Sequence, residues 1–459
     1  MPILRLIAEG VGPFESLDMD FSDGNGKPHL GPHILAGVNG SGKSTALRTI
    51  AWVLDRGQLG FKYDEWLEAL KGYGFSRALL RIDSAAPTGS VVAVSKFGIS
   101  PPPQPDLDHL RRWAQERTPC TWDSPMGHAA HHSPEAGSLW QITPWEPAPV
   151  RGAVAAYSPS KSLRHTPNPD LTKRLESYYE GCLGFESTVS NESIQSWLLG
   201  LYSKRAIARD RKQPSSDYTL SLERFERALQ LLYREEVAFD VEIEPTLQPR
   251  LKVRGQSLNF SQLPDGMRST VGWISDFMMR QDMTEKTAEP NGKRPGILLL
   301  DEVDAHLHPL WQRRLLPAMR EALPDVQIIC TSHSPFVISS CPGARVHVLE
   351  KDEHGRAHAR PPVDSPIGES VTTTLKEIFG VSSRFDIKTE GELNEWNDLK
   401  RAEAAGSLSR SQKDRLTELT HTLAARSEEL KSIVASNAAA ELLELKPRNG
   451  RAKREKVLK

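Results

Sequence analysis

The chain has 459 residues, a formal net charge of −1 and 25% charged residues, which is the composition of an ordinary globular protein. This charge excludes a global field that attracts nucleic acid or an anionic membrane, and leaves only local basic patches open. No run of about 18 apolar residues predicts a membrane span. Four scattered cysteines and an N-terminus without a secretory pattern predict a cytoplasmic protein with reduced thiols.

The first elements alternate between strand and helix patterns. Residues 3–7 and 17–21 predict strands, and the short apolar segment 32–36 predicts a buried strand. Apolar side chains at helical spacing follow over 44–54. Strands are expected again at 78–83 and 90–97. This order predicts a compact start in which strands and a helix alternate.

The middle of the chain changes character twice. Residues 101–149 are rich in proline, histidine and tryptophan without periodicity, which predicts a surface loop or insertion. After a strand at 150–157, helical patterns at 171–179, 191–209 and 217–237 predict an inserted helical lobe. Strands are expected again at 237–243 and 250–253.

A glycine-rich segment lies between the predicted strand 32–36 and the helix after it. It reads G-V-N-G-S-G-K-S-T from Gly37 to Thr45. Such a loop turns backbone N–H groups toward phosphates at a helix N-terminus, where the dipole favours anions. Lys43 is expected to contact the β- and γ-phosphates, and Ser44 to reach Mg²⁺. The predicted phosphate-binding residues are Gly37, Asn39, Gly40, Ser41, Gly42, Lys43, Ser44 and Thr45.

Two later segments supply the polar groups that a nucleotide hydrolase needs. The apolar run 297–300 ends in Asp301 and Glu302. Asp301 is predicted to hold Mg²⁺ through water, and Glu302 to polarise the attacking water. The strand at 326–330 leads to His333, which is expected to contact the γ-phosphate from the ligand side of the sheet.

Two histidine groups allow a metal hypothesis beside a simpler one. His306 and His308 precede Pro309, which favours a helix start over a metal site. A second group consists of Cys120, His128, His131 and His132. These residues are interpreted as side chains of a surface loop without a metal-binding role, with a zinc site as the alternative.

Together these motifs resemble the ABC-type ATPases of the SMC, RecF and OLD group. The segment F-S-Q-L-P-D-G-M-R-S at 260–269 resembles the signature motif of that group, which opens a helix. The resemblance implies an ATP site shared between two protomers. In such a site Leu263, Asp265, Gly266 and Arg268 of one protomer approach ATP bound to the other. The signature serine is replaced by Pro264, which puts tight ATP closure and fast hydrolysis in doubt. The glutamine of the Q-loop has no clear counterpart, and Gln141 is only a weak candidate.

The resemblance implies an α/β fold of the ABC type, with a mixed sheet flanked by helices. The expected domains are a first half of the ATPase head at 1–167, the helical lobe at 168–236, the second half at 237–365 and a C-terminal helical region at 366–459. Length, the compact lobe and the run 368–386 resemble PtuA-like ATPases of Septu-type antiphage systems. That family implies an ATP- and Mg²⁺-dependent homo-oligomer that regulates a partner HNH nuclease, with DNA reached through the complex.

Two other functions stay open from the sequence. An OLD-type nuclease would need a TOPRIM domain, and Thr389-Glu390-Gly391-Glu392 resembles its first acidic motif. Only 67 residues follow Glu392, and they look helical and basic, which disfavours the further metal-binding strands. A RecF-like DNA-binding repair ATPase is the other alternative. The leucine face of a helix at 411–434 either docks on its own core or contacts a partner. The last 14 residues, which carry seven Lys or Arg, form a solvated tail or contact nucleic acid.

Overall fold

The computed structural model describes most of the chain, in two compact units, Met1–Gly380 and Val381–Lys459. Described are residues 2–54, 75–83, 90–98, 113, 116, 128–132, 139–143, 152–159, 175, 181–185, 191–213, 216–244, 246–284, 293–381 and 385–435. In the strands at 75–83, 90–98, 128–132 and 139–143, side chains are described only at 78–82. The helix expected at 171–179 and the basic tail lie outside these residues.

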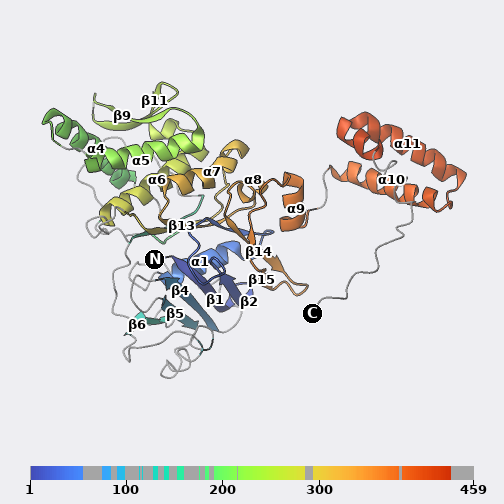
Figure 1. Ribbon diagram of the computed structural model, residues 1–459, viewed down its shortest axis with the longest axis horizontal. Coiled ribbons are helices and arrows are strands. Elements are labelled where there is room, and N and C mark those ends of the chain that lie inside the picture. Colours follow the sequence, from blue (N-terminus) through green and yellow to red (C-terminus); the bar gives the residue numbers. More distant parts are fainter. Residues whose placement is uncertain are drawn as a thin grey trace, which may run out of the picture. The chain divides into compact units, whose positions relative to one another are not determined.

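A mixed seven-stranded sheet forms the centre of the first unit (Figure 1). Its order is β15-β14-β3-β13-β12-β8, with β16 paired to β14. The five strands from β14 to β8 run parallel, and β15 and β16 are antiparallel to β14. The bounds are β3 His33–Ala36, β8 Ala153–Tyr157, β12 Gly296–Leu300, β13 Val326–Thr331, β14 Arg345–Lys351, β15 Ala357–Ala359 and β16 Val363–Asp364. Strands β3, β8, β12 and β13 are fully buried, as expected for parallel strands covered on both faces.

A second sheet is antiparallel and has the order β2-β1-β4-β5-β7-β6. Its strands are β1 Ile3–Val11, β2 Phe14–Asp20, β4 Phe75–Asp83, β5 Ser90–Gly98, β6 His128–His132 and β7 Leu139–Thr143. Of the surface loop or insertion predicted at 101–149, the loop alternative does not hold for the ten residues of β6 and β7, which extend this sheet beyond β5. Backbone pairing with a distant strand produces these short elements, and the local sequence carries no periodicity that announces them.

The two sheets are held together by a helix and a buried amide. Helix α1 (Lys43–Leu54) contacts β13 of the central sheet and β1, β4 and β5 of the antiparallel sheet. The side chain of Gln327 in β13 accepts from the backbone N–H of Ile3 at 2.7 Å and donates to its carbonyl at 2.9 Å. Because Gln327 is completely buried, both bonds are shielded from water, and they set how β1 lies against β13.

A helical layer covers the other face of the central sheet (Figure 1). It consists of α4 (Asn191–Asp210), α5 (Ser216–Tyr233), α6 (Asp265–Thr284) and α7 (Pro309–Ala322). A small sheet, β9 (Val237–Glu242), β10 (Gln248–Val253) and β11 (Gln256–Leu258), packs on α4 and α5. The short helices are η1 (Phe260–Gln262), α8 (Pro335–Ile338) and α9 (Val371–Phe379). This arrangement confirms the predicted α/β fold of the ABC type.

The second unit is a helical hairpin of α10 (Ile387–Ala404) and α11 (Arg410–Arg426). Its core consists of Trp396, Leu416, Leu419, Leu423, Leu430 and Val434. The leucine face predicted at 411–434 is therefore buried against its own unit. Within the described residues, no helix combines the length and apolar character that crossing a membrane requires.

Two buried histidines join β3 to β14 at one end of the central sheet. His33 and His347 are 0% and 1% exposed, and His33 Nδ1 lies 3.1 Å from His347 Nε2. Burial lowers the pKa of His347 to about 3 and holds the pKa of His33 well below its ordinary value. Both rings are thus neutral in the folded state, with one nitrogen donating to the other.

We expect this pair to make the protein less stable in mild acid. Unfolded histidine titrates near pH 6.5, so the contribution is complete above that pH and is lost as pH falls toward 3. Each histidine would lower the free energy of unfolding by at most about 1.4 kcal/mol for each unit that the pH falls. Urea unfolding of the wild type and His347→Phe at pH 7.5 and 5.5 measures this slope. Equal slopes in the two proteins would rule out the pair as the cause.

Candidate nucleotide-binding site

The predicted phosphate loop connects β3 to α1. Gly37 and Gly42 have φ angles of +145° and +93°, which side chains rarely adopt. A Cβ on Gly37 would lie 2.2 Å from the carbonyl oxygen of Leu349, and one on Gly42 would meet the Phe14 ring at 2.4 Å. Glycine is therefore required at both positions by conformation and by space. The loop opens at the N-terminus of α1, where backbone N–H groups and the helix dipole favour an anion.

Lys43 lies inside this loop rather than in solvent. Its ammonium donates to the carbonyl oxygens of Gly37 and Val38, at 2.9 Å each, and the residue is 5% exposed. Burial lowers the Lys43 pKa to about 8, although Asp301 and Glu302 oppose the shift. A phosphate in the loop would supply the anionic partner that this ammonium has only in part.

Asp301 connects three segments that are far apart in the sequence. Its Oδ1 accepts a hydrogen bond from Ser44 Oγ at 2.8 Å and another from Thr331 Oγ1 at 2.7 Å. The carboxylate therefore ties the phosphate loop and the end of β13 to the end of β12. Oxygen ligands are those that Mg²⁺ prefers, and it usually takes one or two of them beside phosphate oxygens and water. Ser44 and Asp301 would hold Mg²⁺ here, and the ion would neutralise negative charge on the phosphates.

Glu302 follows with a backbone that is unusual for its residue type. Its φ is +46°, in the left-handed region, and its N–H donates to Thr331 Oγ1 at 2.7 Å. This conformation costs energy and persists only where neighbouring contacts hold it. Glu302 is exposed whereas Asp301 is 7% exposed, so the two adjacent carboxylates have different environments. An exposed carboxylate beside the phosphate loop can reach a water molecule there.

The hydroxyl of Thr331 is a positioning group that the sequence patterns did not single out. It donates to Asp301 and accepts from the Glu302 backbone, so one atom orients both acidic residues. We expect Thr331→Val, which keeps the shape, to lower kcat for ATP hydrolysis about tenfold or more, since lost buried hydrogen bonds cost roughly 1–3 kcal/mol. Thr331→Ser should keep most of the activity. A valine variant with the parental kcat would contradict this role.

His333 lies just beyond β13, on the same side of the sheet as the loop. Its backbone N–H donates to Asp304 Oδ1 at 3.3 Å. Burial and, to a smaller extent, the Lys43 charge lower the pKa of its ring, which is therefore neutral at neutral pH. Next to it, Ser334 Oγ donates to Gln312 Oε1 at 2.7 Å, and Gln312 donates to the carbonyls of Asp304 and Leu307. Gln312 thus connects the loop that follows β12 to the His333 segment.

The other histidines have structural positions. His308 is the N-cap of α7, and its Nδ1 accepts from the Leu310 N–H at 3.3 Å, with Pro309 as the first helical residue. His306 is exposed and has a φ of +61°. Of the group Cys120, His128, His131 and His132, Cys120 lies outside the described residues, and the histidines are described only by backbone, in β6. Among the residues with described side chains, no three His, Cys, Asp or Glu gather as metal ligands.

The signature-like segment forms η1 and then the start of α6. Asp265 is exposed and pairs with Arg268. Leu263 is 3% exposed, so the residue is buried in the core. A Cβ on Gly266 would lie 2.3 Å from the carbonyl oxygen of His306, so glycine lets α6 begin directly against the loop that follows β12. The structure therefore joins the signature segment to this loop within one protomer and leaves Asp265 at the surface.

The end of β8 lies close to the acidic residues that follow β12. The Asp301 N–H donates to the Tyr157 carbonyl at 2.8 Å, so this strand end lies beside the acidic pair. The Tyr157 hydroxyl donates to Asp276 of α6 at 2.5 Å, and Arg280 donates to the same carboxylate at 2.7 Å. Burial raises the pKa of Tyr157 well above its ordinary value, so the phenol keeps its proton. Gln141, the weak candidate for the Q-loop glutamine, lies in β7 of the antiparallel sheet and not in β8.

Comparisons with known proteins give partial matches. Residues 167–339, less than half of the chain, match the family model described as "AAA domain, putative AbiEii toxin, Type IV TA system". The fold and the site together define the class, which is an α/β fold of the ABC type with a P-loop.

The chain is also similar in sequence to segments of a Septu protein and of a retron probable ATPase. It is 32% identical to the Septu protein PtuA of Bacillus mycoides (strain KBAB4) over 117 residues, 26% of this chain and 16% of that protein. It is 25% identical to the Retron Vc95 probable ATPase of Vibrio cholerae serotype O1 biovar El Tor over 131 residues, 28% of this chain and 25% of that protein. The matched segments thus span a quarter or less of these relatives. Among solved structures, the SMC head domain from Thermotoga maritima is 17% identical, with a TM-score of 0.41, and the match covers 79% of this chain and 99% of that one.

Proposed function

We propose that the protein binds and hydrolyses ATP with Mg²⁺, as the ATPase subunit of an antiphage defence complex. The observation that carries the proposal is the Asp301 carboxylate, which accepts from Ser44 of the phosphate loop and from Thr331 beside Glu302. In this reaction Lys43 and the loop backbone bind phosphates, Ser44 and Asp301 hold Mg²⁺, Glu302 activates water, and His333 contacts the γ-phosphate. Similarity to PtuA and to a retron ATPase supports the cellular role.

We further propose that two copies close on ATP, with the exposed start of α6 of one copy facing the phosphate loop of the other. Asp265 is exposed at this helix start, and Gly266 allows the helix to lie against its own His306 segment. The family resemblance supplies this arrangement. The oligomer would then regulate a partner HNH nuclease according to the bound nucleotide, and DNA would be cleaved by that partner.

A glycine substitution tests the shared site. Gly266→Ala places a Cβ 2.3 Å from the His306 oxygen, so α6 must shift at its N-terminus. We expect this variant to bind ATP normally and to lose ATP-dependent self-association, measured as mass by light scattering. Gly200→Ala, in α4, is the matched control, because a Cβ on Gly200 would meet nothing within 4 Å. Equal self-association of the two variants would contradict the shared site.

The partner proposal has its own test. The tagged chain is purified from its native host, the copurifying proteins are identified by mass spectrometry, and DNA cleavage is measured with and without ATP. A stoichiometric HNH protein whose cleavage responds to ATP supports the regulatory role. A chain recovered alone, with an ATPase rate that rises with DNA, would favour a RecF-like repair function instead.

A further inference from the structure

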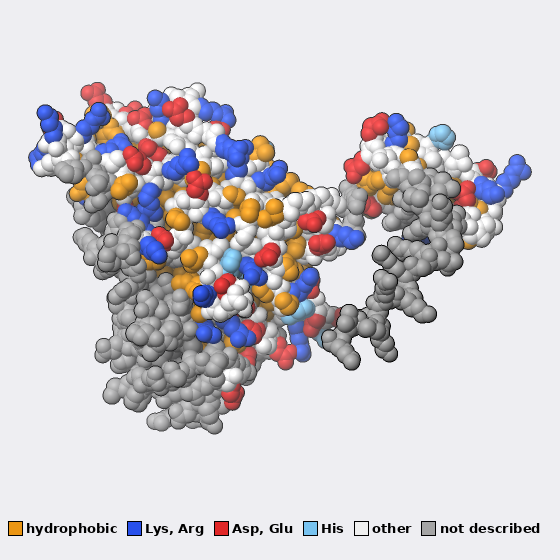
Figure 2. Space-filling model, in the orientation of Figure 1, with side chains coloured by type: hydrophobic (Ala, Val, Ile, Leu, Met, Phe, Trp, Pro, Cys, Tyr) orange, Lys and Arg blue, Asp and Glu red, His pale blue; other side chains and the backbone are white. Residues whose placement is uncertain are grey.

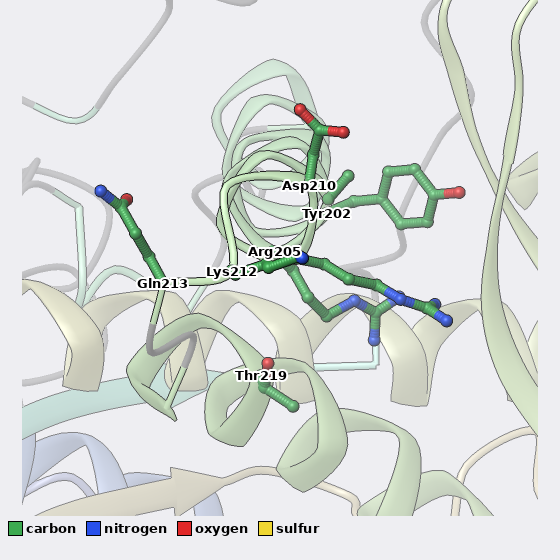
Figure 3. Close-up of a pocket in the computed structure, with 8 residues that line it drawn as sticks. Tyr202, Arg205, Asp210, Lys212, Gln213 and Thr219 are labelled. Atoms are coloured by element: carbon green, nitrogen blue, oxygen red, sulfur yellow. The ribbon is translucent and has the colours of Figure 1, made fainter.

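A cavity of about 920 Å³ lies between the end of α4 and the start of α5, in the helical lobe (Figure 3). Arg205 and Arg209 line it from α4, Lys212 from the turn after α4, and Thr219 from α5. Among the labelled side chains, Arg205 and Lys212 lie between the two helices, and Asp210, which also lines the cavity, extends from α4 (Figure 3). Among the described lining residues, three are cationic and one, Asp210, is acidic.

The positive charge continues beyond the cavity. Five of the nine residues from 204 to 212 are Lys or Arg, and Asp210 is the one acid among them. Figure 2 shows Lys and Arg side chains gathered at the tip of the lobe that holds the end of α4. Arg205 and Arg209 are one turn apart, about 5–6 Å between Cβ atoms. The stretch from Arg205 to Lys212 covers roughly 10 Å along the chain direction, at about 1.5 Å per residue.

Three other exposed arginines of the first unit each pair with a carboxylate. Arg227 pairs with Glu321, Arg254 with Glu235, and Arg356 with Glu15. Among the described residues, by contrast, no carboxylate forms an ion pair with Arg209, Arg211 or Lys212, all of which are exposed. Arg205 lies over the Tyr202 ring, 5.4 Å from its centroid, and has Glu226 as its electrostatic neighbour. The lobe thus carries a cluster of cations whose charge the described residues do not neutralise.

We propose that this surface, formed by Arg205, Arg209, Arg211 and Lys212, binds the phosphate backbone of a nucleic-acid strand. Phosphates repeat every 3.4 Å or so along each strand of a duplex, so cations spread over about 10 Å can contact two or three of them. A single small anion would use the cavity but leave Arg211 and Lys204 without a role. Phosphate contacts carry no base specificity, so binding is sequence-independent and sensitive to salt. The surface includes no residue of the nucleotide site, so its role does not rest on the proposed ATPase or nuclease-regulating functions.

The test compares two double charge reversals in the full chain. Arg209→Glu with Lys212→Glu changes the cluster. Lys252→Glu with Arg254→Glu makes the same change in net charge at two other exposed positions of the same unit, in and after β10. Fluorescence anisotropy measures the binding of labelled single-stranded and duplex DNA of mixed sequence, without ATP, over a series of salt concentrations. ATP binding by both variants is measured separately and should equal that of the wild type.

We expect the cluster variant to bind DNA at least tenfold more weakly, with a salt slope that is smaller by about 2, one unit for each phosphate contact removed. The control variant should retain the parental affinity and slope. Equal losses in the two variants, or no loss in either, would overturn the proposal. So would displacement of the DNA by inorganic phosphate at matched ionic strength, because it would indicate a site for a small anion. Labelled polyglutamate that binds more tightly than DNA and is lost in the same variant would indicate an acidic protein partner.

Discussion

Replacing Glu302 by glutamine should leave ATP bound and slow its hydrolysis by on the order of 10²-fold or more, the usual contribution of a positioned general base. The substitution keeps the size of the side chain and leaves the backbone hydrogen bond from residue 302 to Thr331 intact. Asp301 also keeps its contacts with Ser44 and Thr331, so Mg²⁺ binding should persist. Single-turnover hydrolysis, together with the affinity for ATP, separates the chemical step from binding.

The control for this variant is Glu353→Gln, an isosteric change at an exposed turn position outside the site. It should hydrolyse ATP at the parental rate. Hydrolysis by Glu302→Gln at the parental rate would remove Glu302 as the base. A joint loss of binding and hydrolysis would instead place Glu302 among the Mg²⁺-holding groups.

The parts of this site that could be predicted from the sequence are those built from neighbouring residues. The phosphate loop and the strand that ends in Asp301 and Glu302 are each a continuous segment with a local pattern. A loop between a buried strand and a helix can adopt few geometries, so the residue types indicate the phosphate cradle. The same holds for His308, whose position before Pro309 predicts the helix start that the structure shows.

Features that depend on distant partners could not be predicted in this way. Thr331 is separated from Asp301 by 30 positions in the chain, and its hydroxyl acquires a role only when β12 and β13 pair in parallel. Gln327 and Ile3 are 324 positions apart. The burial of Leu263 is also a tertiary effect, since the same segment leaves Asp265 exposed. Sheet pairing and core packing decide these cases, and neither leaves a periodic signal in a single segment.

The cationic cluster at the end of α4 is an intermediate case. Its composition is visible in the sequence, where five Lys or Arg occur within nine residues. A net charge of −1 for the whole chain conceals it, because acidic residues elsewhere balance the total. Only the structure shows that a cavity opens between α4 and α5 and that Arg205, Arg209 and Lys212 line it.

The second large effect is expected for Lys43→Ala, which should lower the affinity for ATP by at least 10²-fold and abolish measurable hydrolysis. The ammonium is already desolvated, as its pKa of about 8 indicates, so its attraction to phosphate is weakly screened. Alanine removes that charge. It also leaves the carbonyls of Gly37 and Val38 without their donor, so the conformation of the phosphate loop is less well held. Titration with a fluorescent ATP analogue measures the loss.

Lys351→Ala is the matched comparison for that variant. Lys351 is exposed, and its ammonium lies beside the phosphate loop, 2.9 Å from the position that a Cβ on Gly40 would take. An exposed lysine beside the same loop is screened by water, so its removal should weaken ATP binding only a fewfold. If the two alanine variants lose equal affinity, general positive charge near the loop would account for binding. A much larger loss for Lys43 would instead require the buried ammonium within the loop, since the two variants change the net charge equally.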